Sequence, residues 1–352
     1  AISYRALNRS FMMKLLCISL LFAPSSACSP AFPAGRHLIQ NTSKDIGGRR
    51  QWLLIVPDGF QQGSPAVVTL HGMGNTPWWT DPVMNLSSNL QAHGWLGILP
   101  FGKAKVTQAG AAACCNSGCN ASCCMNPLTT GGSGNHTCGW DVTGHPGQGG
   151  DLGSAHDVDF LRSLARWATS SMCADASRIF LAGFSAGAMM ADRMGCEAPD
   201  VFAAVGIQAG IIMKPCQRQL KAIPFLEIEG TADPLYPSLY KNVFNWSLRN
   251  DCMVKGVTNV SDESACQQSL EESSQVVLST KTSRCYKLSG CAADTRYCTV
   301  AGLQHHWSGH VEPGCPGSSW CSSRGVLDGD IDSTKQILDF FLHTSSRVTV
   351  VV

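Results

Sequence analysis

The chain has 352 residues, of which 44% are hydrophobic and 14% charged, a composition typical of a globular protein. Its formal net charge is +1 at pH 7, so the charge balance does not support binding to nucleic acid or another polyanion. The length suits a single α/β domain with insertions, and the 35 glycines and 17 prolines predict many turns and long loops.

Residues 1–27 are typical of a few upstream residues followed by an export signal. Lys14 precedes a short apolar run over 15–22, and the small residues at 24–27 offer a cleavage site. The run is far shorter than the roughly 20 residues that a membrane span needs, so a signal is favoured over a membrane anchor. We therefore expect a secreted, extracellular protein with no stable membrane span.

Cysteine usage indicates the same compartment. The chain has 18 cysteines, and thiols at this density form disulfides in an oxidising environment. Asn-x-Ser/Thr sequons predict a glycoprotein. They begin at Asn41, Asn85, Asn120, Asn135, Asn245 and Asn259.

After an N-terminal segment at 28–48, apolar runs alternate with helical spacings. Short apolar runs are typical of buried parallel strands, and apolar residues three or four positions apart indicate amphipathic helices. In chain order we expect strands at 51–56, 66–70 and 95–99, a helix at 155–168, a strand at 179–182, a helix at 187–194, strands at 202–207, 225–228 and 298–300, and a helix at 332–342. This alternation predicts one mostly parallel α/β sheet in a domain over 49–345, with a tail at 346–352.

The segment Gly183-Phe184-Ser185-Ala186-Gly187 matches the pattern G-x-S-x-G. A predicted strand precedes it and a predicted helix follows it, the context in which this pattern holds a nucleophilic serine in a strained turn. Glycines flank the serine because a Cβ atom would collide there. The Ala186 N–H, at the start of the helix, can bind an oxyanion. This context favours a functional serine over a chance match in a glycine-rich chain.

A serine hydroxyl needs a base, and in this arrangement an acid and then a histidine follow the serine along the chain. Asp233 lies in a loop just past the predicted strand FLEI, where a carboxylate can orient an imidazole; its alternative role is an Asx-turn. The later loop VAGLQHHWSGH offers three candidate bases, His305, His306 and His310.

A second oxyanion donor is expected where the stretch TLHGMG ends an earlier strand. The backbone N–H of Met73 can point into the same crevice as the serine, whereas His71 is assigned a structural role. Such a site needs neither a metal nor a cofactor.

A glycine- and cysteine-rich insert occupies about 102–153. Six cysteines lie from Cys114 to Cys138, in adjacent pairs and at C-x₃-C spacing. Zinc sites prefer C-x₂-C pairs, so a disulfide-stapled loop is favoured over a metal site. The insert follows a strand whose C-terminal end should lie on the ligand-binding side, so we expect it to line or cover the pocket. A rigid surface decoration is the alternative.

These pieces resemble the secreted esterases of the polyhydroxybutyrate depolymerase and feruloyl esterase group, related to carbohydrate esterase family one. The similar segments span about residues 50 to 343 and include LLIVPDGF, VVTLHGMG, RIFLAGFSAGAMMADRMGC, EGTADPLYP, GLQHHWSGH and ILDFF. The resemblance implies the α/β-hydrolase fold. It also assigns the nucleophile to Ser185, the acid to Asp233, the base to His305 and the first oxyanion donor to Met73.

Other assignments follow less directly. His306 is the alternative base, and Phe184 and Trp307 are expected at the pocket. The sequence departs from the family at Glu229, where the family often has a histidine before Gly-Thr-x-Asp. This places a second carboxylate near Asp233 and could alter how the acid loop is held.

The sequence therefore predicts a secreted serine ester hydrolase that works through an acyl-enzyme. The expected substrates are polymer-linked esters, with feruloyl or acetyl groups of plant cell-wall xylan favoured slightly over a polyhydroxyalkanoate. The alternative of another class is a non-catalytic binding protein with a hydrolase fold. Such proteins usually lack a member of the Ser-His-Asp set, and here every member has a candidate.

Overall fold

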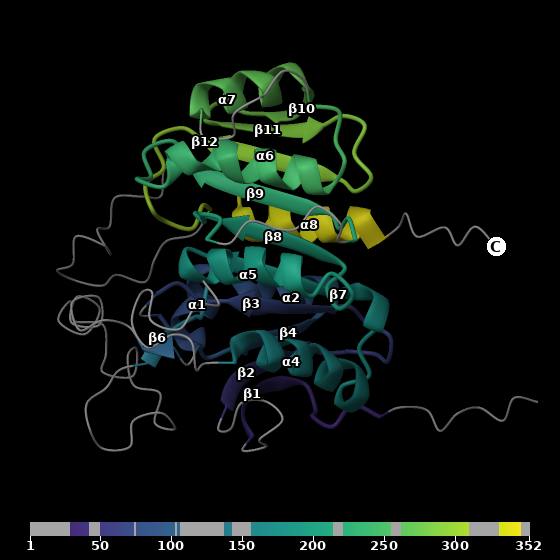
Figure 1. Ribbon diagram of the computed structural model, residues 1–352. Coiled ribbons are helices and arrows are strands. Elements are labelled where there is room, and N and C mark those ends of the chain that lie inside the picture. The colour runs from purple at the N-terminus through teal and green to yellow at the C-terminus, as the bar shows by residue number, and fades with distance from the viewer. Residues whose placement is uncertain are drawn as a thin grey trace, which may run out of the picture.

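The computed structural model describes residues 29–41, 50–73, 75–102, 104–105, 137–142, 156–213, 221–254, 262–309 and 331–345. Within these ranges a ten-stranded sheet has the order β1-β2-β4-β3-β7-β8-β9-β12-β11-β10 (Figure 1). Its strands are β1 Gly35–Asn41, β2 Arg50–Val56, β3 Ala66–Leu70, β4 Leu96–Pro100, β7 Ile179–Phe184, β8 Ala204–Gln208, β9 Phe225–Gly230, β10 Ser274–Ser279, β11 Ser283–Leu288 and β12 Thr295–Val300.

The centre of the sheet is parallel, from β4 through β3, β7, β8 and β9 to β12. At one edge β2 and β1 pair antiparallel, and at the other β11 and β10 do the same. The predicted mostly parallel sheet is thus confirmed. Since parallel strands all point the same way, the loops that follow them meet at one edge of the sheet.

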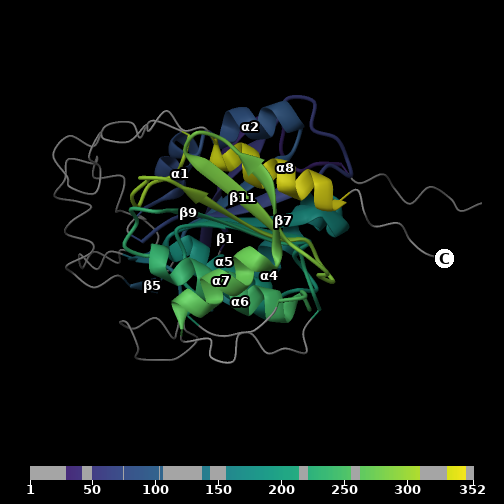
Figure 2. The same ribbon diagram turned by 90° about the horizontal axis from the view of Figure 1, so that it is seen from above.

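Helices cover both faces of the sheet. They are α1 Pro77–Val83, α2 Leu86–His93, α4 Asp157–Ser171, α5 Ala186–Glu197, α6 Leu239–Arg249, α7 Glu263–Glu272 and α8 Ser333–Ser345. Figure 2 shows α1, α2 and α8 on one side of the sheet and α4, α5 and α6 on the other. Helix α7 packs beside α6, and both helices contribute to a third, smaller cluster of buried hydrophobic residues. The sheet is therefore buried between two helical layers.

Strand residues alternate between the two cores. Leu53 and Ile55 of β2 belong to the core under α2 and α8, whereas Trp52 and Leu54 belong to the core under α4 and α5. All five residues of β3 are buried. A strand covered on both faces needs apolar side chains at nearly every position, which explains why the central strands were visible as continuous apolar runs.

Several elements outside the central strands escaped prediction. Strands β1, β10 and β11 and helices α1, α2, α6 and α7 were not expected. Strand β1 is partly exposed along its length, yet it pairs with β2 over seven residues. The sheet therefore begins ahead of residue 49, inside the segment assigned to 28–48.

The part of the predicted insert that the structure describes follows β4 along the chain. β5 Ala104–Lys105 pairs antiparallel with β6 Thr137–Gly139, forming a small separate sheet. Strand β5 follows the C-terminal end of β4, which is the edge predicted to bind ligands. The chain between β5 and β6, with most of the cysteines of the insert, lies outside the described residues, as do the export signal and the tail.

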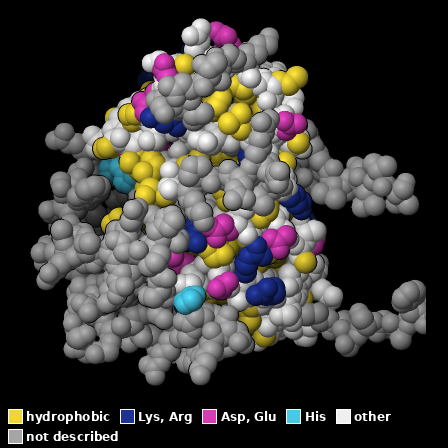
Figure 3. All heavy atoms as spheres, viewed as in Figure 1, with side chains coloured by type: hydrophobic (Ala, Val, Ile, Leu, Met, Phe, Trp, Pro, Cys, Tyr) yellow, Lys and Arg dark blue, Asp and Glu magenta, His cyan; other side chains and the backbone are white. Residues whose placement is uncertain are grey.

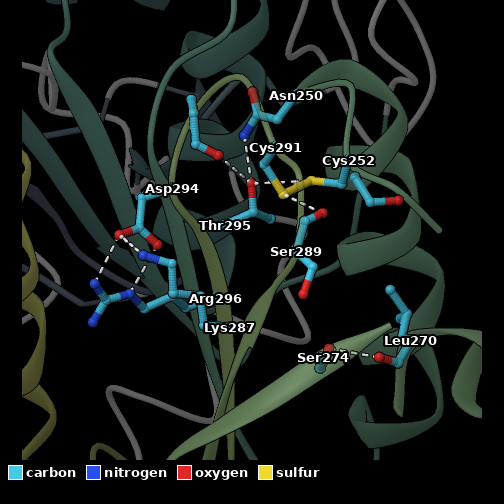
Figure 4. The surroundings of a disulfide bond; sticks show 12 residues. Asn250, Cys252, Leu270, Ser274, Lys287, Ser289, Cys291, Asp294, Thr295 and Arg296 are labelled. Carbon is cyan, nitrogen blue, oxygen red and sulfur yellow. Dashed lines mark hydrogen bonds and ion pairs between the residues drawn. A yellow bond between two sulfur atoms is a disulfide. The ribbon is translucent and has the colours of Figure 1, made fainter. Parts of the chain in front are cut away.

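Two disulfides hold the β11–β12 end of the sheet. Cys285 and Cys298 are directly paired residues of β11 and β12, and Cys252 after α6 is bonded to Cys291 in the loop between these strands. Figure 4 shows Thr295 of β12 beside the Cys252–Cys291 disulfide. The Thr295 hydroxyl accepts a hydrogen bond of 2.8 Å from Asn250 Nδ2. The expected disulfides are therefore found in this region.

On the face of the molecule shown in Figure 3, neither sign of charge dominates among the described residues. On the face in Figure 3, acidic and basic side chains are interspersed with hydrophobic ones. This fits the formal net charge of +1. Within the described ranges, no helix has the length and apolar character needed to cross a membrane.

Candidate active site

Ser185 lies in the turn between β7 and α5. Its backbone has φ 54° and ψ −121°, a conformation that residues with a Cβ atom rarely adopt. The turn is held at both ends, because Ser185 N–H donates to the Gln208 carbonyl and Met189 N–H donates to the Ser185 carbonyl, both at 3.0 Å. The predicted strand-turn-helix setting of this serine is therefore present.

The two glycines of the pattern leave no space for a side chain. A Cβ on Gly183 would collide with the Gly187 carbonyl, and a Cβ on Gly187 would collide with the Leu70 carbonyl at the end of β3. These contacts bring α5 close to the sheet. They explain why the sequence has glycine on both sides of Phe184-Ser185-Ala186.

Ser185, His305 and Asp233 form one hydrogen-bonded series. His305 Nε2 lies 2.9 Å from Ser185 Oγ, and His305 Nδ1 lies 2.7 Å from Asp233 Oδ2. A carboxylate only accepts, so Nδ1 carries the proton and Nε2 is left to accept the serine proton. The three side chains come from the loops after β7, β9 and β12 at one edge of the sheet.

Asp233 is held as a carboxylate. Its side chain is fully buried, and burial by itself would raise its pKa. The hydrogen bonds from His305 and from the Leu235 N–H, 2.8 Å from Oδ1, outweigh burial and lower the pKa of Asp233 below its usual value. The Leu235 bond is itself an Asx-turn, so the two roles weighed for this residue occur together.

The segment after β3 lies against the nucleophile. An added Cβ on Gly72 would be 3.4 Å from Ser185 Cβ and 3.3 Å from Phe184 Cδ1. Met73 follows with 59% of its surface exposed. Ala186 opens α5, so its N–H has no carbonyl partner within the helix. The two predicted oxyanion donors therefore lie on the two segments that border Ser185.

His71 is part of the framework. It is almost fully buried, its Nδ1 donates to the Gly72 carbonyl at 2.8 Å, and its Nε2 accepts from the Gly102 N–H at 2.9 Å. Burial lowers the pKa of His71 to about 4, so the ring is neutral at pH 7. The Trp140 indole donates to its carbonyl at 2.8 Å. His71 thus links the loops after β3 and β4.

The adjacent His306 occupies a different environment. It is 8% exposed, and its carbonyl accepts a hydrogen bond of 2.6 Å from Gln208 Nε2. The structure thus brings the His305 ring, not that of His306, to Ser185. His310 lies outside the described residues.

Phe184 packs beside the His305 imidazole, and Trp307 packs against Phe184. The Phe184 ring centroid is 5.1 Å from that of His305 and 6.0 Å from that of Trp307. Both rings are buried, with exposed fractions of 4% and 3%, and their place at the substrate pocket stays a prediction. Trp307 Nε1 donates to Thr334 of α8 at 2.9 Å, which anchors the ring to the core.

Gln208 is a residue of the site that the sequence analysis missed. Its carbonyl accepts from Ser185 N–H, and its side-chain amide donates to the His306 carbonyl. Its Oε1 also accepts from Ser308 N–H at 3.4 Å. Gln208 therefore ties the serine turn to the histidine loop. A polar residue at the end of a buried parallel strand was the available signal.

Among the described residues, no cluster of three or more His, Cys, Asp or Glu side chains could hold a metal ion.

Parts of the chain are similar to known proteins. Residues 130–240, which include Ser185 and Asp233, match the family described as Esterase PHB depolymerase. The chain is 25% identical to the probable feruloyl esterase C of Aspergillus niger over 64% of this chain and 70% of that protein. It is 42% identical to the putative esterase NocK of Nocardia uniformis, over 23% of this chain and 24% of that protein.

A solved structure shares the fold. The acetyl xylan esterase from Aspergillus awamori superposes with a TM-score of 0.51 at 15% identity, covering 78% of this chain and 94% of that chain. At 15% identity this match is evidence for the fold alone. The chain thus has the α/β-hydrolase fold and is related to the polyhydroxybutyrate depolymerase and feruloyl esterase group of esterases.

Proposed function

We propose that the protein is a secreted carboxylic ester hydrolase that uses Ser185, His305 and Asp233 to form and hydrolyse an acyl-enzyme. The supporting observation is the continuous hydrogen-bonded series from Ser185 Oγ to the Asp233 carboxylate, placed on a strained turn. The export signal predicted over 1–27 supports the location.

In the first half of the reaction His305 Nε2 takes the proton of Ser185 as Oγ attacks the ester carbonyl. The Met73 and Ala186 N–H groups then bind the oxyanion, and one such donor is typically worth about 10²–10³ in rate. Asp233 keeps the proton of the imidazole on Nδ1 and stabilises the imidazolium that forms. His305 gives its new proton to the departing alcohol.

In the second half water replaces the alcohol. His305 takes a proton from water, which attacks the acyl group on Ser185, and the oxyanion forms again in the same position. Collapse of this intermediate releases the acid and returns the proton to Ser185 Oγ. The cycle uses only side chains and backbone N–H groups, so no cofactor is part of the proposal.

The proposed substrate is an ester attached to an extracellular polymer. The relatives are named for feruloyl and acetylxylan esters, which favours such groups on plant cell-wall xylan. The matched family is described as Esterase PHB depolymerase, which favours a polyhydroxyalkanoate as the second candidate. Turnover of methyl ferulate, acetylated xylan and polyhydroxybutyrate by one enzyme preparation separates these candidates.

An organophosphonate probe tests the chemistry apart from the substrate. The probe should label the wild-type protein at Ser185, and Ser185→Ala should lose both labelling and nearly all hydrolysis of an aryl acetate. Labelling that persists in folded Ser185→Ala would contradict the assignment of the nucleophile. A wild-type protein that is neither labelled nor active would favour the non-catalytic alternative.

A further inference from the structure

Glu229 places a second carboxyl group beside the acid of the site. It lies at the end of β9, four positions before Asp233, and is completely buried. Its Oε1 accepts from the Gly230 N–H at 3.2 Å. Its Oε2 is buried, and no donor in the described part of the chain reaches it. Asp233 is its neighbour: interaction between the two carboxyl groups raises the pKa of Glu229 and lowers that of Asp233.

Two ionised carboxylates cannot make this interaction favourable, because both only accept hydrogen bonds and their charges repel. A single shared proton removes the repulsion and supplies the missing donor. Asp233 already accepts hydrogen bonds from His305 and Leu235, both of which favour its ionised form. Within the described ranges, Glu229 accepts one hydrogen bond, from the neighbouring Gly230 N–H.

The electrostatic surroundings of Glu229 favour the same distribution. Burial first, and then the charges of Asp233 and Glu227, together raise the pKa of Glu229 to about 10. The pKa of Asp233 is lowered. The proton therefore stays on Glu229 at neutral pH.

We propose that Glu229 is a positioning residue that acts as a neutral carboxylic acid, donating its O–H to the Asp233 carboxylate and so holding that carboxylate for His305. This inference rests on the proposed Ser-His-Asp chemistry. The proton does not move during the reaction. The carboxylate torsion of an aspartate is broad, and three donors on one carboxylate restrict it to one orientation. The imidazole orientation that Ser185 requires follows from it.

The neutrality of Glu229 matters as much as its hydrogen bond. An ionised Glu229 would add a second negative charge behind Asp233 and favour the protonated form of His305, which cannot accept the serine proton. The titratable groups facing Glu229 are Asp233 and Glu227, and the Asp192 carboxyl of α5 lies beyond Glu227. These three are acids, so none of them compensates a negative charge on Glu229; the groups beside them that can carry positive charge are His305, bonded to Asp233, and Arg249, which acts on Asp192.

Glu227 supplies a matched control. It is also completely buried and lies two positions earlier on the same strand, so both side chains point to the same face. Its Oε1 accepts from Asn242 of α6 at 2.9 Å, and no hydrogen bond between described residues joins it to Ser185, His305 or Asp233. Glu227→Gln therefore perturbs the same buried face without touching Asp233.

The test compares Glu229→Gln, Glu229→Met and Glu227→Gln with the wild type, using aryl acetate kinetics from about pH 5 to pH 9. Gln keeps an N–H donor without a charge, so kcat should stay within about threefold and the acid limb of the pH profile should not move. Met removes the donor, so kcat should fall by about tenfold or more with KM unchanged. Glu227→Gln should match the wild-type profile.

Two results would overturn the inference. If Glu229→Gln shifts the acid limb to lower pH, the wild-type residue carried a charge. If folded Glu229→Met keeps full kcat, the donor is unnecessary. If the Met variant does not fold, the Gln profile still decides. Wild-type protein that leaves Ser185 unlabelled would instead refute the proposed function, and the pH dependence of unfolding described below would still test the protonation of Glu229.

Discussion

At the scale of single residues, Ser185 combines a reactive side chain with an unfavourable backbone. Its φ of 54° and ψ of −121° lie where a Cβ atom is crowded, and such conformations cost about 1–3 kcal/mol each. Bonds to Gln208 and Met189 hold the turn against relaxation. The conformation exposes the hydroxyl to His305, which connects local strain with the proposed chemistry.

This strain predicts an unusual result for two variants of Ser185, in which glycine is no less stable than alanine. Glycine usually makes a protein less stable than alanine by roughly 0.4–1 kcal/mol, because it gives the unfolded chain more freedom. At residue 185 relief of strain should offset that loss. We expect Ser185→Gly to be at least as stable in thermal unfolding as Ser185→Ala, with both variants inactive. A Gly variant less stable by the usual amount would mean that the turn relaxes.

Substitutions of the adjacent His305 and His306 should have different effects on turnover, because the two side chains have different contacts. His305→Ala removes the only imidazole seen beside Ser185 within the described residues and should abolish aryl acetate turnover. His306→Ala should keep most turnover while lowering the unfolding temperature, because His306 is buried. Turnover should fall on acidification, since only the neutral imidazole accepts a proton. Full activity in His305→Ala would transfer the role to His306.

At the scale of elements, the turn between β7 and α5 depends on how closely the helix approaches the sheet. Gly183 and Gly187 permit that approach, and β7 lies between β3 and β8 in the middle of the sheet. The central strands were predictable because burial on both faces requires apolar runs. Helix α1 was not, because its seven residues include two tryptophans and an internal proline rather than a helical apolar stripe.

A pair of substitutions tests this close approach. Gly187→Ala should lower aryl acetate turnover by about tenfold or more and destabilise the protein by about 1–3 kcal/mol, because its Cβ would meet the Leu70 carbonyl. The control is Gly59→Ala, in an exposed turn with φ 74° and no neighbour within 4 Å. It should cost about 1 kcal/mol through the backbone alone and leave turnover unchanged. Equal effects on turnover would contradict the model of a packed turn.

At the scale of the whole molecule, buried ionisable groups make stability depend on pH. Burial raises the pKa of Asp192 to about 7 and that of Glu229 to about 10, so the folded protein holds protons that the unfolded chain has released. The free energy of unfolding therefore falls as pH rises from the ordinary pKa values of these two groups to their raised values. His71 acts in the opposite sense, because its lowered pKa of about 4 removes stability as pH falls below about 6.5.

Glu229→Gln should remove the part of this pH-dependent loss of stability that comes from Glu229. Unfolded Glu229 releases its proton near pH 4.5, whereas the folded residue keeps it until about pH 10. The stability of Glu229→Gln relative to wild type should increase with pH between these values, by at most about 1.4 kcal/mol per pH unit. Denaturant unfolding at several pH values measures it. A difference that stays constant with pH would mean that folded Glu229 is ionised.

The sequence by itself determined the parts of this protein that depend on neighbouring residues. The apolar runs indicated the central strands, and Gly183-Phe184-Ser185-Ala186-Gly187 indicated the strained turn, because a strand, a turn and a helix start are local structures. The chain order of Ser185, Asp233 and the histidines indicated which loops should meet. The resemblance to the esterase group favoured His305 over His306, but the local patterns alone do not show which ring faces the serine.

Only the tertiary structure decided what depends on distant segments. The distances from His305 to Ser185 and Asp233 span 120 and 72 residues of chain, so no local pattern contains them. Burial of Phe184 and Trp307, and the Gln208 link between two loops, follow from packing of the whole sheet. The protonation of Glu229 is of the same kind, because the neighbours in the fold, and not the glutamate itself, decide where a buried proton lies.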